Sequence, residues 1–265
     1  MAVSKLKRYQ AIIEDIFGRL HKGQADFVFH RDEIGVSAKN VDVKPPKNYG
    51  DLVYYFRYRK KLPQSILDHQ APDMHWLILG AGDAMYRFRQ SNVAYIYPNK
   101  GLLVRKIPDS TPEIIGHYAL SDEQALLAKI RYNRLIDTFL GITAYSLQNH
   151  LRTKISNYGQ IEIDELYIGV DARGAQYIVP VQAKGGKDIL GVIQTIQDTV
   201  FCQSVPRYAN CVLRPVSAQF MPNDVIAMFE LLFDGNDVSI VREQHYRLTD
   251  ASAITATDLS TYKLP

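Results

Sequence analysis

Residues Gln160–Gly186, with the sequence QIEIDELYIGVDARGAQYIVPVQAKGG, decide how this chain is expected to fold. Both halves of the stretch are rich in isoleucine, valine and tyrosine, which favour strands. Arg173-Gly174 lies between the two halves and is typical of a tight turn. The stretch therefore predicts a β-hairpin of two long strands.

Four polar side chains interrupt the apolar pattern of this hairpin. Side chains alternate across a strand, so Glu162 and Asp164 share one face, as do Gln182 and Lys184 on the next strand. A carboxylate and a neutral oxygen suit a hard cation such as Mg²⁺, which lowers the pKa of a bound water. A lysine beside them can stabilise a developing oxyanion. The alternative is a surface hairpin with ordinary polar residues on its solvent face.

The segment Glu162-Ile163-Asp164, followed by a hairpin and by Gln182-Ala183-Lys184, resembles the core of the PD-(D/E)xK nuclease superfamily. That superfamily includes restriction enzymes, Holliday-junction resolvases and repair nucleases, and the resemblance covers roughly residues 143–216. It implies that Asp164 and Gln182 hold Mg²⁺ or Mn²⁺, that Lys184 assists the attacking water, and that Glu162 belongs to the catalytic group. Gln182 departs from the commoner Glu or Asp, as in the QxK variant of the Mrr-like restriction enzymes.

The resemblance also implies a fold and a substrate. The expected class is α/β (α+β), with a restriction-endonuclease-like core whose central mixed sheet is flanked by helices. An N-terminal α+β region would precede that core.

Two other residues compete for roles near the hairpin. Asp171 lies closer to Gln182 in sequence but falls at the turn, so Asp164 is favoured as the metal ligand. His150 precedes the hairpin and is interpreted as a surface histidine.

Composition excludes several classes of protein. The chain has 265 residues, 46% of them hydrophobic, which supports one large or two medium domains with a core. No apolar run reaches the ~18 residues of a membrane span, and the N-terminus lacks the apolar region of a signal peptide. Cys202 and Cys211 make neither a metal-ligand spacing nor a disulfide framework. A cytoplasmic protein without membrane contact is therefore expected.

Charge divides the chain into two halves. Residues 1–110 hold 18 Lys and Arg against 11 Asp and Glu, a net charge of +7, whereas residues 111–265 hold 13 against 17, a net charge of −4. This asymmetry predicts a basic N-terminal nucleic-acid-recognition region, residues 1–110, and a nuclease-like domain, residues 111–265. The boundary is placed at Pro108–Pro112, where two prolines flank a short polar linker. Chance scatter of charge is the alternative explanation.

The segment DLVYYFRYRKK at residues 51–61 interleaves aromatic and basic residues. Cations neutralise phosphates and aromatic rings stack on bases, so the segment is predicted to contact nucleic acid. The residues assigned to this contact are Tyr55, Arg57, Arg59, Lys60 and Lys61. Read as a strand, the same alternation is also typical of a half-buried strand whose basic side is merely solvated.

Periodicity and turn signals predict the remaining elements. Helices are expected at residues 4–20, 121–140 (with a Ser121 capping box and Gly141 as the stop), 143–155 and 188–203. Strands are expected at residues 25–29, 74–79, 211–220, 225–233 and 238–248, and a hairpin at residues 94–105.

These observations together favour a Mg²⁺-dependent endonuclease that hydrolyses DNA, of a restriction or defence type. A catalytically weak nucleic-acid-binding or regulatory protein that keeps the nuclease fold is the alternative that Gln182 favours. A nucleotide-binding protein that uses the glycine turn Gly80–Gly82 ranks last, because a lone GxG is a weak signal. DNA is the expected partner, and the sequence leaves a homodimer open.

Overall fold

The computed structural model describes residues 4–118, 123–155, 158–186 and 188–263. The chain forms two compact units. The N-terminal unit comprises Met1–Ala94 together with Thr153–Ile161, and the C-terminal unit comprises Tyr95–Arg152 together with Glu162–Pro265. The first unit thus ends at Ala94 rather than near residue 110, because the next strands pair within the second unit.

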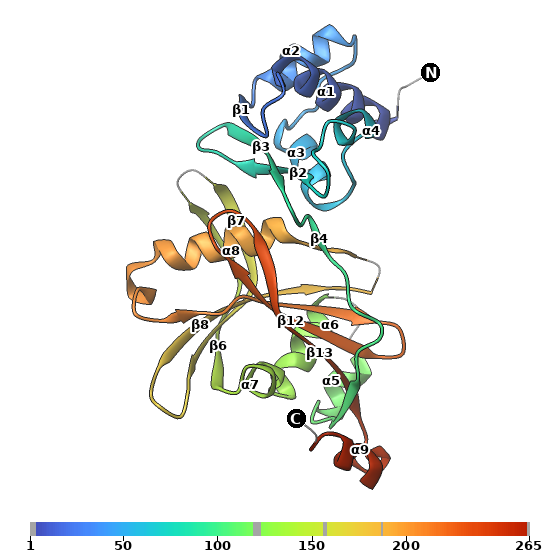
Figure 1. Ribbon diagram of the computed structural model, residues 1–265, viewed down its shortest axis with the longest axis vertical. Coiled ribbons are helices and arrows are strands. Elements are labelled where there is room, and N and C mark those ends of the chain that lie inside the picture. Colours follow the sequence, from blue (N-terminus) through green and yellow to red (C-terminus); the bar gives the residue numbers. More distant parts are fainter. Residues whose placement is uncertain (1–3, 119–122, 156–157, 187, 264–265) are drawn as a thin grey trace. The chain divides into compact units, whose positions relative to one another are not determined.

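The N-terminal unit combines short helices with a small antiparallel sheet (Figure 1). In chain order its elements are α1 (Lys5–Leu20), β1 (Asp26–His30), α2 (Glu33–Asn40), α3 (Gly50–Tyr58), α4 (Gln64–Leu67), β2 (His75–Gly80) and β3 (Met85–Ser91). The strands lie in the order β1-β3-β2, and both pairings are antiparallel. The predicted helix at residues 4–20 and the strands near 25–29 and 74–79 are confirmed.

Helix α1 provides one wall of the core of this unit. It begins after Ser4, whose hydroxyl oxygen accepts a hydrogen bond from the backbone N–H of Lys7 at 3.3 Å. Ile12, Ile13 and Ile16 are fully buried at helical spacing. They pack with buried aromatic side chains of the sheet and with the apolar side of α3.

The segment at residues 51–61 forms helix α3 instead of a strand. Leu52, Val53 and Phe56 are buried, and this i, i+1, i+4 spacing matches the helical period. The side-chain oxygen of Asn48 accepts a hydrogen bond from the N–H of Gly50 at 3.0 Å and helps the helix begin. The tyrosines favour a strand locally, but burial of the three apolar side chains against the core outweighs that preference.

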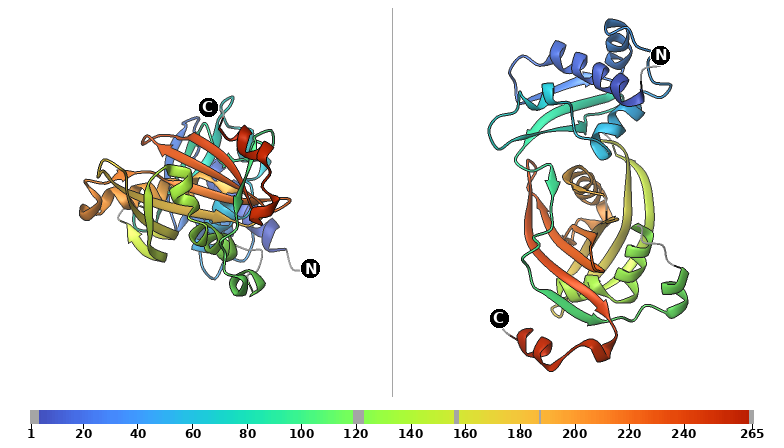
Figure 2. Two further views of the ribbon diagram at one scale, coloured as in Figure 1. Left: turned by 90° about the horizontal axis from the view of Figure 1, so that it is seen from below. Right: turned by 90° about the vertical axis from the view of Figure 1, so that its right-hand side faces the viewer.

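The C-terminal unit is built on an eight-stranded mixed sheet that is strongly curved (Figure 2). The sheet order is β5-β13-β12-β11-β8-β7-β6, and β10 pairs with β8 beside this path. Its strands are β5 (Val104–Pro108), β6 (Thr143–Ile155), β7 (Gly159–Val170), β8 (Gln176–Lys184), β10 (Val212–Leu213), β11 (Val216–Met221), β12 (Val225–Phe233) and β13 (Val238–Thr249). The other elements are β4 (Tyr95–Ile96), α5 (Glu113–Tyr118), α6 (Glu123–Tyr132), α7 (Leu135–Leu140), β9 (Leu190–Gly191), α8 (Val192–Ser204), the 3₁₀ turns Pro206–Tyr208 and Ala251–Ala253, and α9 (Ala256–Thr261).

Strand β8 lies at the centre of this sheet and has helices on both faces. Val181 and Ala183 pack into a core with Leu126 and Ile130 of α6. On the opposite face, Ile178 packs with Leu166 of β7 and Cys202 of α8. The α/β class and the mixed sheet flanked by helices, both expected from the sequence, are therefore confirmed.

The hairpin of β7 and β8 is present as predicted. The two strands are antiparallel, with Tyr167 opposite Val179 and Glu165 opposite Val181. On its other side, β8 runs parallel to β11, with Gln182 opposite Ser217. A parallel neighbour requires a crossover, and α8 provides it. The predicted helix near 188–203 and the three C-terminal strand regions are also confirmed.

Residues 143–155 form strand β6, and the helix predicted there is wrong. Ala144, Leu147 and Leu151 recur at spacings that resemble a helix, but Leu147 is half exposed. Gly141 has a left-handed backbone with φ of 68° and ends α7 just before the strand. Pairing with β7 then supplies the backbone hydrogen bonds that a helix would have made internally.

Two further predictions were wrong in detail. The expected hairpin at residues 94–105 does not form, because β4 pairs with β9 and β5 pairs with β13. The long helix expected at residues 121–140 is divided into α6 and α7 at Arg134, which has a positive φ of 50°. Ser121, the expected N-cap, lies outside the described residues.

Candidate active site

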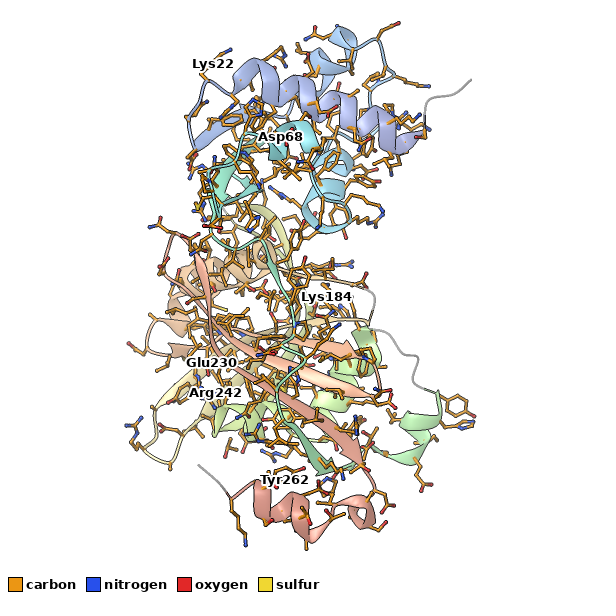
Figure 3. All side chains as sticks on the ribbon, turned by 45° about the vertical axis from the view of Figure 1, so that its right-hand side comes forward. Lys22, Asp68, Lys184, Glu230, Arg242 and Tyr262 are labelled. Atoms are coloured by element: carbon orange, nitrogen blue, oxygen red, sulfur yellow. The ribbon has the colours of Figure 1, made fainter. Side chains whose placement is uncertain are left out.

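Asp164 lies where the β7–β8 ladder opens. Its Oδ2 atom accepts a hydrogen bond from the backbone N–H of Ala183 on β8 at 2.9 Å. This bond holds the carboxylate against the neighbouring strand, next to Lys184. Lys184, labelled in Figure 3, is the last residue of β8. Its side chain is 20% exposed. The structure thus brings together two of the residues that the sequence assigned to catalysis.

A third residue, Glu123, completes the Asp164–Lys184–Glu123 cluster. The Nζ atom of Lys184 donates a hydrogen bond to Oε1 of Glu123 at 2.7 Å. Glu123 is the first residue of α6, 61 positions before Lys184 in the chain. In the sequence, Glu123 falls within the capping pattern that begins at Ser121. An acidic residue in the first turn of a helix is already explained by its favourable interaction with the helix dipole, so nothing marked Glu123 as a site residue.

Electrostatics tie the cluster together. Burial raises the pKa of Asp164 above its ordinary value, and the negative charge of Glu123 adds to that effect. The Ala183 N–H, the Lys184 charge and a hydrogen bond from Gln194 on α8 oppose it. For Lys184, burial acts to lower the pKa, but the bond to Glu123 and the charge of Asp164 outweigh it and raise the pKa. Lys184 is therefore a persistent cation between two carboxylates.

Asp198 on α8 adds a buried carboxyl group beside the cluster. The residue is 2% exposed, and its Oδ1 atom has no hydrogen-bond partner among the described residues. Burial, followed by the negative charge of Asp164, raises its pKa well above the ordinary value. Asp198 lies four residues after Gln194, so both occupy the side of α8 that faces Asp164. Burial thus favours the neutral form of the Asp198 carboxyl group. No sequence motif marks this residue.

Gln182 shares a face of β8 with Lys184, as the hairpin register requires. It is 2% exposed, and its Oε1 atom accepts a hydrogen bond from the hydroxyl of Ser217 on β11 at 3.3 Å. The carboxamide is therefore buried on the same face as the cluster. Its oxygen already has one neutral donor.

Glu162 takes a different environment from Asp164, although the two lie two residues apart on β7. Its side chain is 42% exposed and pairs with Arg152 on β6 at 3.0 Å. His150 lies 3.6 Å from the same carboxylate oxygen. Glu162 thus belongs to an exposed ion pair between β6 and β7, and the structure gives it no role in the cluster.

Asp171 stabilises the turn of the hairpin. Its Oδ1 atom accepts hydrogen bonds from the N–H groups of Arg173 and Ala175, and its Oδ2 atom accepts one from the hydroxyl of Tyr177. These bonds close the loop between β7 and β8. The carboxylate is fully used in that way, which agrees with the preference for Asp164 over Asp171.

The donor atoms of the cluster suit a hard cation. In the described part of the chain, no group of three or more His, Cys, Asp or Glu side chains is spaced to hold a metal ion. Asp164 and Glu123 repel one another, Lys184 offsets part of that repulsion, and a divalent cation bound beside them would offset more of it. Carboxylate and carboxamide oxygens are the ligands that Mg²⁺ and Mn²⁺ accept. The residue types therefore fit such an ion.

The basic residues predicted to contact nucleic acid separate into two groups. Arg57 points inward: its Nε atom donates to the carbonyl of Ile78 at 2.7 Å, and its guanidinium lies over the ring of Tyr86. Tyr55 is half-buried. Arg59, Lys60 and Lys61 are exposed at the end of α3. The helical period of α3 explains the separation, since a strand would have put Arg57 beside Arg59.

The glycine turn at Gly80–Gly82 serves packing. A Cβ atom at Gly80 would lie 2.2 Å from the backbone oxygen of Tyr158, so only glycine allows this close approach. Gly82 has a φ of 121°, which other residues rarely adopt. Both glycines are explained without a bound nucleotide.

Comparisons with known proteins give no further guide: no family model, no curated protein and no solved structure matches this chain. Among the described residues, none of the helices has the length and apolar character needed to cross a membrane.

Proposed function

We propose that this protein is a Mg²⁺-dependent endonuclease that hydrolyses phosphodiester bonds of DNA, of a restriction or defence type. The single observation that carries the proposal is the convergence of Asp164, in the middle of β7, and Lys184, at the end of β8, with the carboxylate of Glu123 hydrogen-bonded to Lys184. The three residues come from β7, β8 and α6, so the chain has gathered them from distant positions.

The order of elements around the cluster also supports the proposal. Helices α6 and α7 precede three neighbouring strands, β6, β7 and β8, and β7 and β8 are antiparallel. Helix α8 then leads to β11, which runs parallel to β8. With α7 as an additional helix between α6 and β6, this order is similar to the αβββαβ core that the resemblance to the PD-(D/E)xK superfamily implies. In this proposal β6, which was predicted as a helix from the sequence, would be the first strand of that core.

Each residue of the cluster has a role that its surroundings favour. Asp164 and Glu123 would hold the cation, and Gln182 offers a carboxamide oxygen on the same strand face as Lys184. The bound cation would neutralise phosphate charge and acidify a water molecule. Lys184, partly buried and always charged, stabilises negative charge that develops on the phosphate oxygens.

A plasmid-cleavage assay with and without MgCl₂ tests the proposal. We expect Mg²⁺-dependent nicking or linearisation by the wild type, and a loss of at least about 100-fold in Asp164→Asn and in Lys184→Ala, as is typical for groups that stabilise a transition state. Glu162→Gln is the matched control, since it changes an exposed carboxylate two residues away on the same strand. Its activity should remain within about twofold of wild type, the range of a neutral surface change.

The alternative is a catalytically weak nucleic-acid-binding or regulatory protein. Gln182 favours it, because the neutral side chain contributes no charge to a cation and its oxygen already accepts from Ser217. Wild-type protein that binds DNA and leaves plasmids intact in both Mg²⁺ and Mn²⁺ would support this alternative. Equal cleavage by wild type and Lys184→Ala would reject the proposed active site.

A further inference from the structure

In the N-terminal unit, helices α2, α3 and α4 precede the hairpin of β2 and β3. Helices α2 and α3 are joined by the loop at residues 41–49, and β2 and β3 form the antiparallel hairpin that follows. The start of α3 is held against α2 by close packing: a Cβ atom at Gly35 would lie 2.5 Å from the Tyr49 hydroxyl. The core covers one side of α3, and Tyr54 and Tyr58 on the other side are exposed.

The outer side of α3 carries an aromatic pair. Tyr54 and Tyr58 are 49% and 39% exposed, and their ring centroids are 4.9 Å apart. The guanidinium of Arg59 lies over the ring of Tyr54 at 5.1 Å. Large aromatic side chains on the outside of a helix are costly to leave in water and are common where a partner binds.

Exposed cations lie at both ends of this helix. Lys44 and Lys47 are in the loop before α3, and Arg59, Lys60 and Lys61 follow its last turn. Between residues 44 and 61 the sequence has a single acidic residue, Asp51. The surface of α3, defined here as Tyr54, Tyr58 and these five cations, therefore complements a polyanion.

The dimensions of α3 favour a double helix over a single strand. With its side chains an α-helix such as α3 is about 10–12 Å across, and the major groove of B-DNA, roughly 12 Å wide, admits one. Cations beyond the two helix ends could then meet the phosphates on either side of the groove. Tyrosine side chains between them could contact base edges.

We propose that α3 docks in the major groove of duplex DNA, with Tyr54 and Tyr58 against the bases and the flanking cations on the phosphates. The inference rests on the proposed function for the choice of DNA, and it adds the docking element and the duplex form of the substrate. It requires no contact by Arg57, which points into the core.

The test measures binding of the full-length Asp164→Asn protein to a labelled duplex of about 30 base pairs, some three helical turns, by fluorescence anisotropy at several KCl concentrations. Single-stranded DNA of the same sequence and duplex RNA are the comparison probes.

We expect the protein to bind duplex DNA most tightly. The double variant Tyr54→Ala/Tyr58→Ala should bind duplex DNA about tenfold more weakly, as for the loss of one good base contact. Lys60→Ala should reduce the log–log salt slope by about 0.9, the value for one lost phosphate contact. Methylation of guanine N7, a major-groove atom, should also weaken binding.

Lys22→Ala is the matched control for Lys60→Ala. Lys22 is an exposed cation of the same unit, just beyond the last residue of α1 (Figure 3). Lys5, at the first residue of α1, lines a hollow with Tyr54 and Arg59, so the length of α1, about 24 Å for 16 residues, separates Lys22 from α3. The salt slope of Lys22→Ala should equal that of the parent protein.

Several outcomes would overturn the inference. One is preference for single-stranded DNA or duplex RNA. A second is unchanged binding of duplex DNA by Tyr54→Ala/Tyr58→Ala when its circular dichroism spectrum is native. A third is an equal log–log salt slope for Lys60→Ala and Lys22→Ala. Failure here is distinct from failure of the proposed function. If the protein binds duplex DNA through α3 but does not cleave it in Mg²⁺, only the proposed nuclease activity is rejected. If it cleaves DNA and the α3 substitutions leave binding unchanged, only the proposed docking of α3 is rejected.

Discussion

Asp198 shows what a single residue reveals about the C-terminal unit. A buried carboxyl group with an unpaired oxygen is costly to ionise, so the fold favours its protonated form. Its unfolded-state pKa is near 3.8, and its folded-state pKa is well above that value. At pH values between these two pKa values, the folded state binds more protons than the unfolded state. The free energy of unfolding therefore falls as the pH rises through that window.

Replacing Asp198 by asparagine should remove this pH dependence. The asparagine side chain is neutral at every pH, so we expect Asp198→Asn to be more stable than wild type above the folded-state pKa. The difference should shrink as the pH falls towards 3.8. Urea unfolding at a series of pH values measures it. A stability difference that is constant with pH would mean that Asp198 does not change its protonation on unfolding.

Gln182 provides a second prediction at the scale of the residue. Gln182→Glu places a charge at a position that is 2% exposed, so the free protein should be less stable than wild type. Mg²⁺ should recover part of the loss, because ligand binding to the folded state stabilises it. Thermal unfolding with and without MgCl₂ and titration calorimetry measure both effects. Equal Mg²⁺ affinity in variant and wild type would exclude Gln182 from the cation site.

Among the residues of the site, Asp164 and Lys184 could be predicted from the sequence, and Glu123 and Asp198 could not. The hairpin fixes which strand residues share a face, so a short motif was enough to join Asp164 to Lys184. Glu123 and Asp198 come from helices before and after the hairpin. No local pattern states which turn of a helix faces a distant strand, since tertiary packing decides it.

At the scale of elements, a buried ion pair joins α6 to β7. The Nε atom of Arg131 donates to Oε1 of Glu165 at 2.8 Å, and Ser146 of β6 also donates to that oxygen. The Glu165 side chain is fully buried, whereas that of Arg131 is 37% exposed. Glu165 adjoins Asp164 on β7, and Glu123 begins the helix that carries Arg131. The pair therefore aligns the two elements that bring carboxylates to the cluster.

Arg131→Met should destabilise the protein strongly, because it leaves Glu165 buried without its cation. The expected cost is about 3 kcal/mol, at the lower end of the range for a broken buried pair because Arg131 is partly exposed. Arg152→Met breaks the exposed pair with Glu162 and should cost less than about 1 kcal/mol. Urea unfolding of both variants gives the comparison. Equal costs would show that burial of Glu165 has no special effect.

The elements themselves were predicted unevenly. The hairpin, helix α8 and the C-terminal strands were predicted because their apolar periods are long and their turns contain glycine or aspartate. Strand β6 was missed because the spacing of Ala144, Leu147 and Leu151 fits a helix. Helix α3 was read with strand alternation because tyrosine-rich segments suit either element. In both cases the decision came from pairing and burial against parts of the chain that are remote in sequence.

At the scale of the whole molecule, the chain contributes to the N-terminal unit twice. Thr153–Ile161 belongs to that unit together with Met1–Ala94. The backbone of Tyr158 packs so closely against Gly80 that no side chain fits between them. An exposed ion pair of Lys154 with Asp83 adds little to this packing. The N-terminal unit is thus complete only when the later segment is present.

We therefore expect a fragment of residues 1–94 to be less stable than the same residues in the full chain. Strand β2 would lose the packing of Tyr158 at its last residue, Gly80. Hydrogen exchange followed by mass spectrometry compares protection of β2 and β3 in the fragment and in the full chain. Equal protection in both would mean that residues 153–161 only rest on the unit without stabilising it.

Because two separate stretches of the chain build the N-terminal unit, recombination cannot easily exchange this unit between genes. A single crossover near codon 94 would transfer most of the N-terminal unit to a new partner and leave codons 153–161 behind. The transplanted unit would meet a foreign segment at Gly80, where a Cβ atom has no room. Recombination would have to carry both stretches at once. If α3 docks on DNA as proposed, new specificity should therefore arise mainly by point substitution on α3, and only seldom by exchange of the whole N-terminal unit.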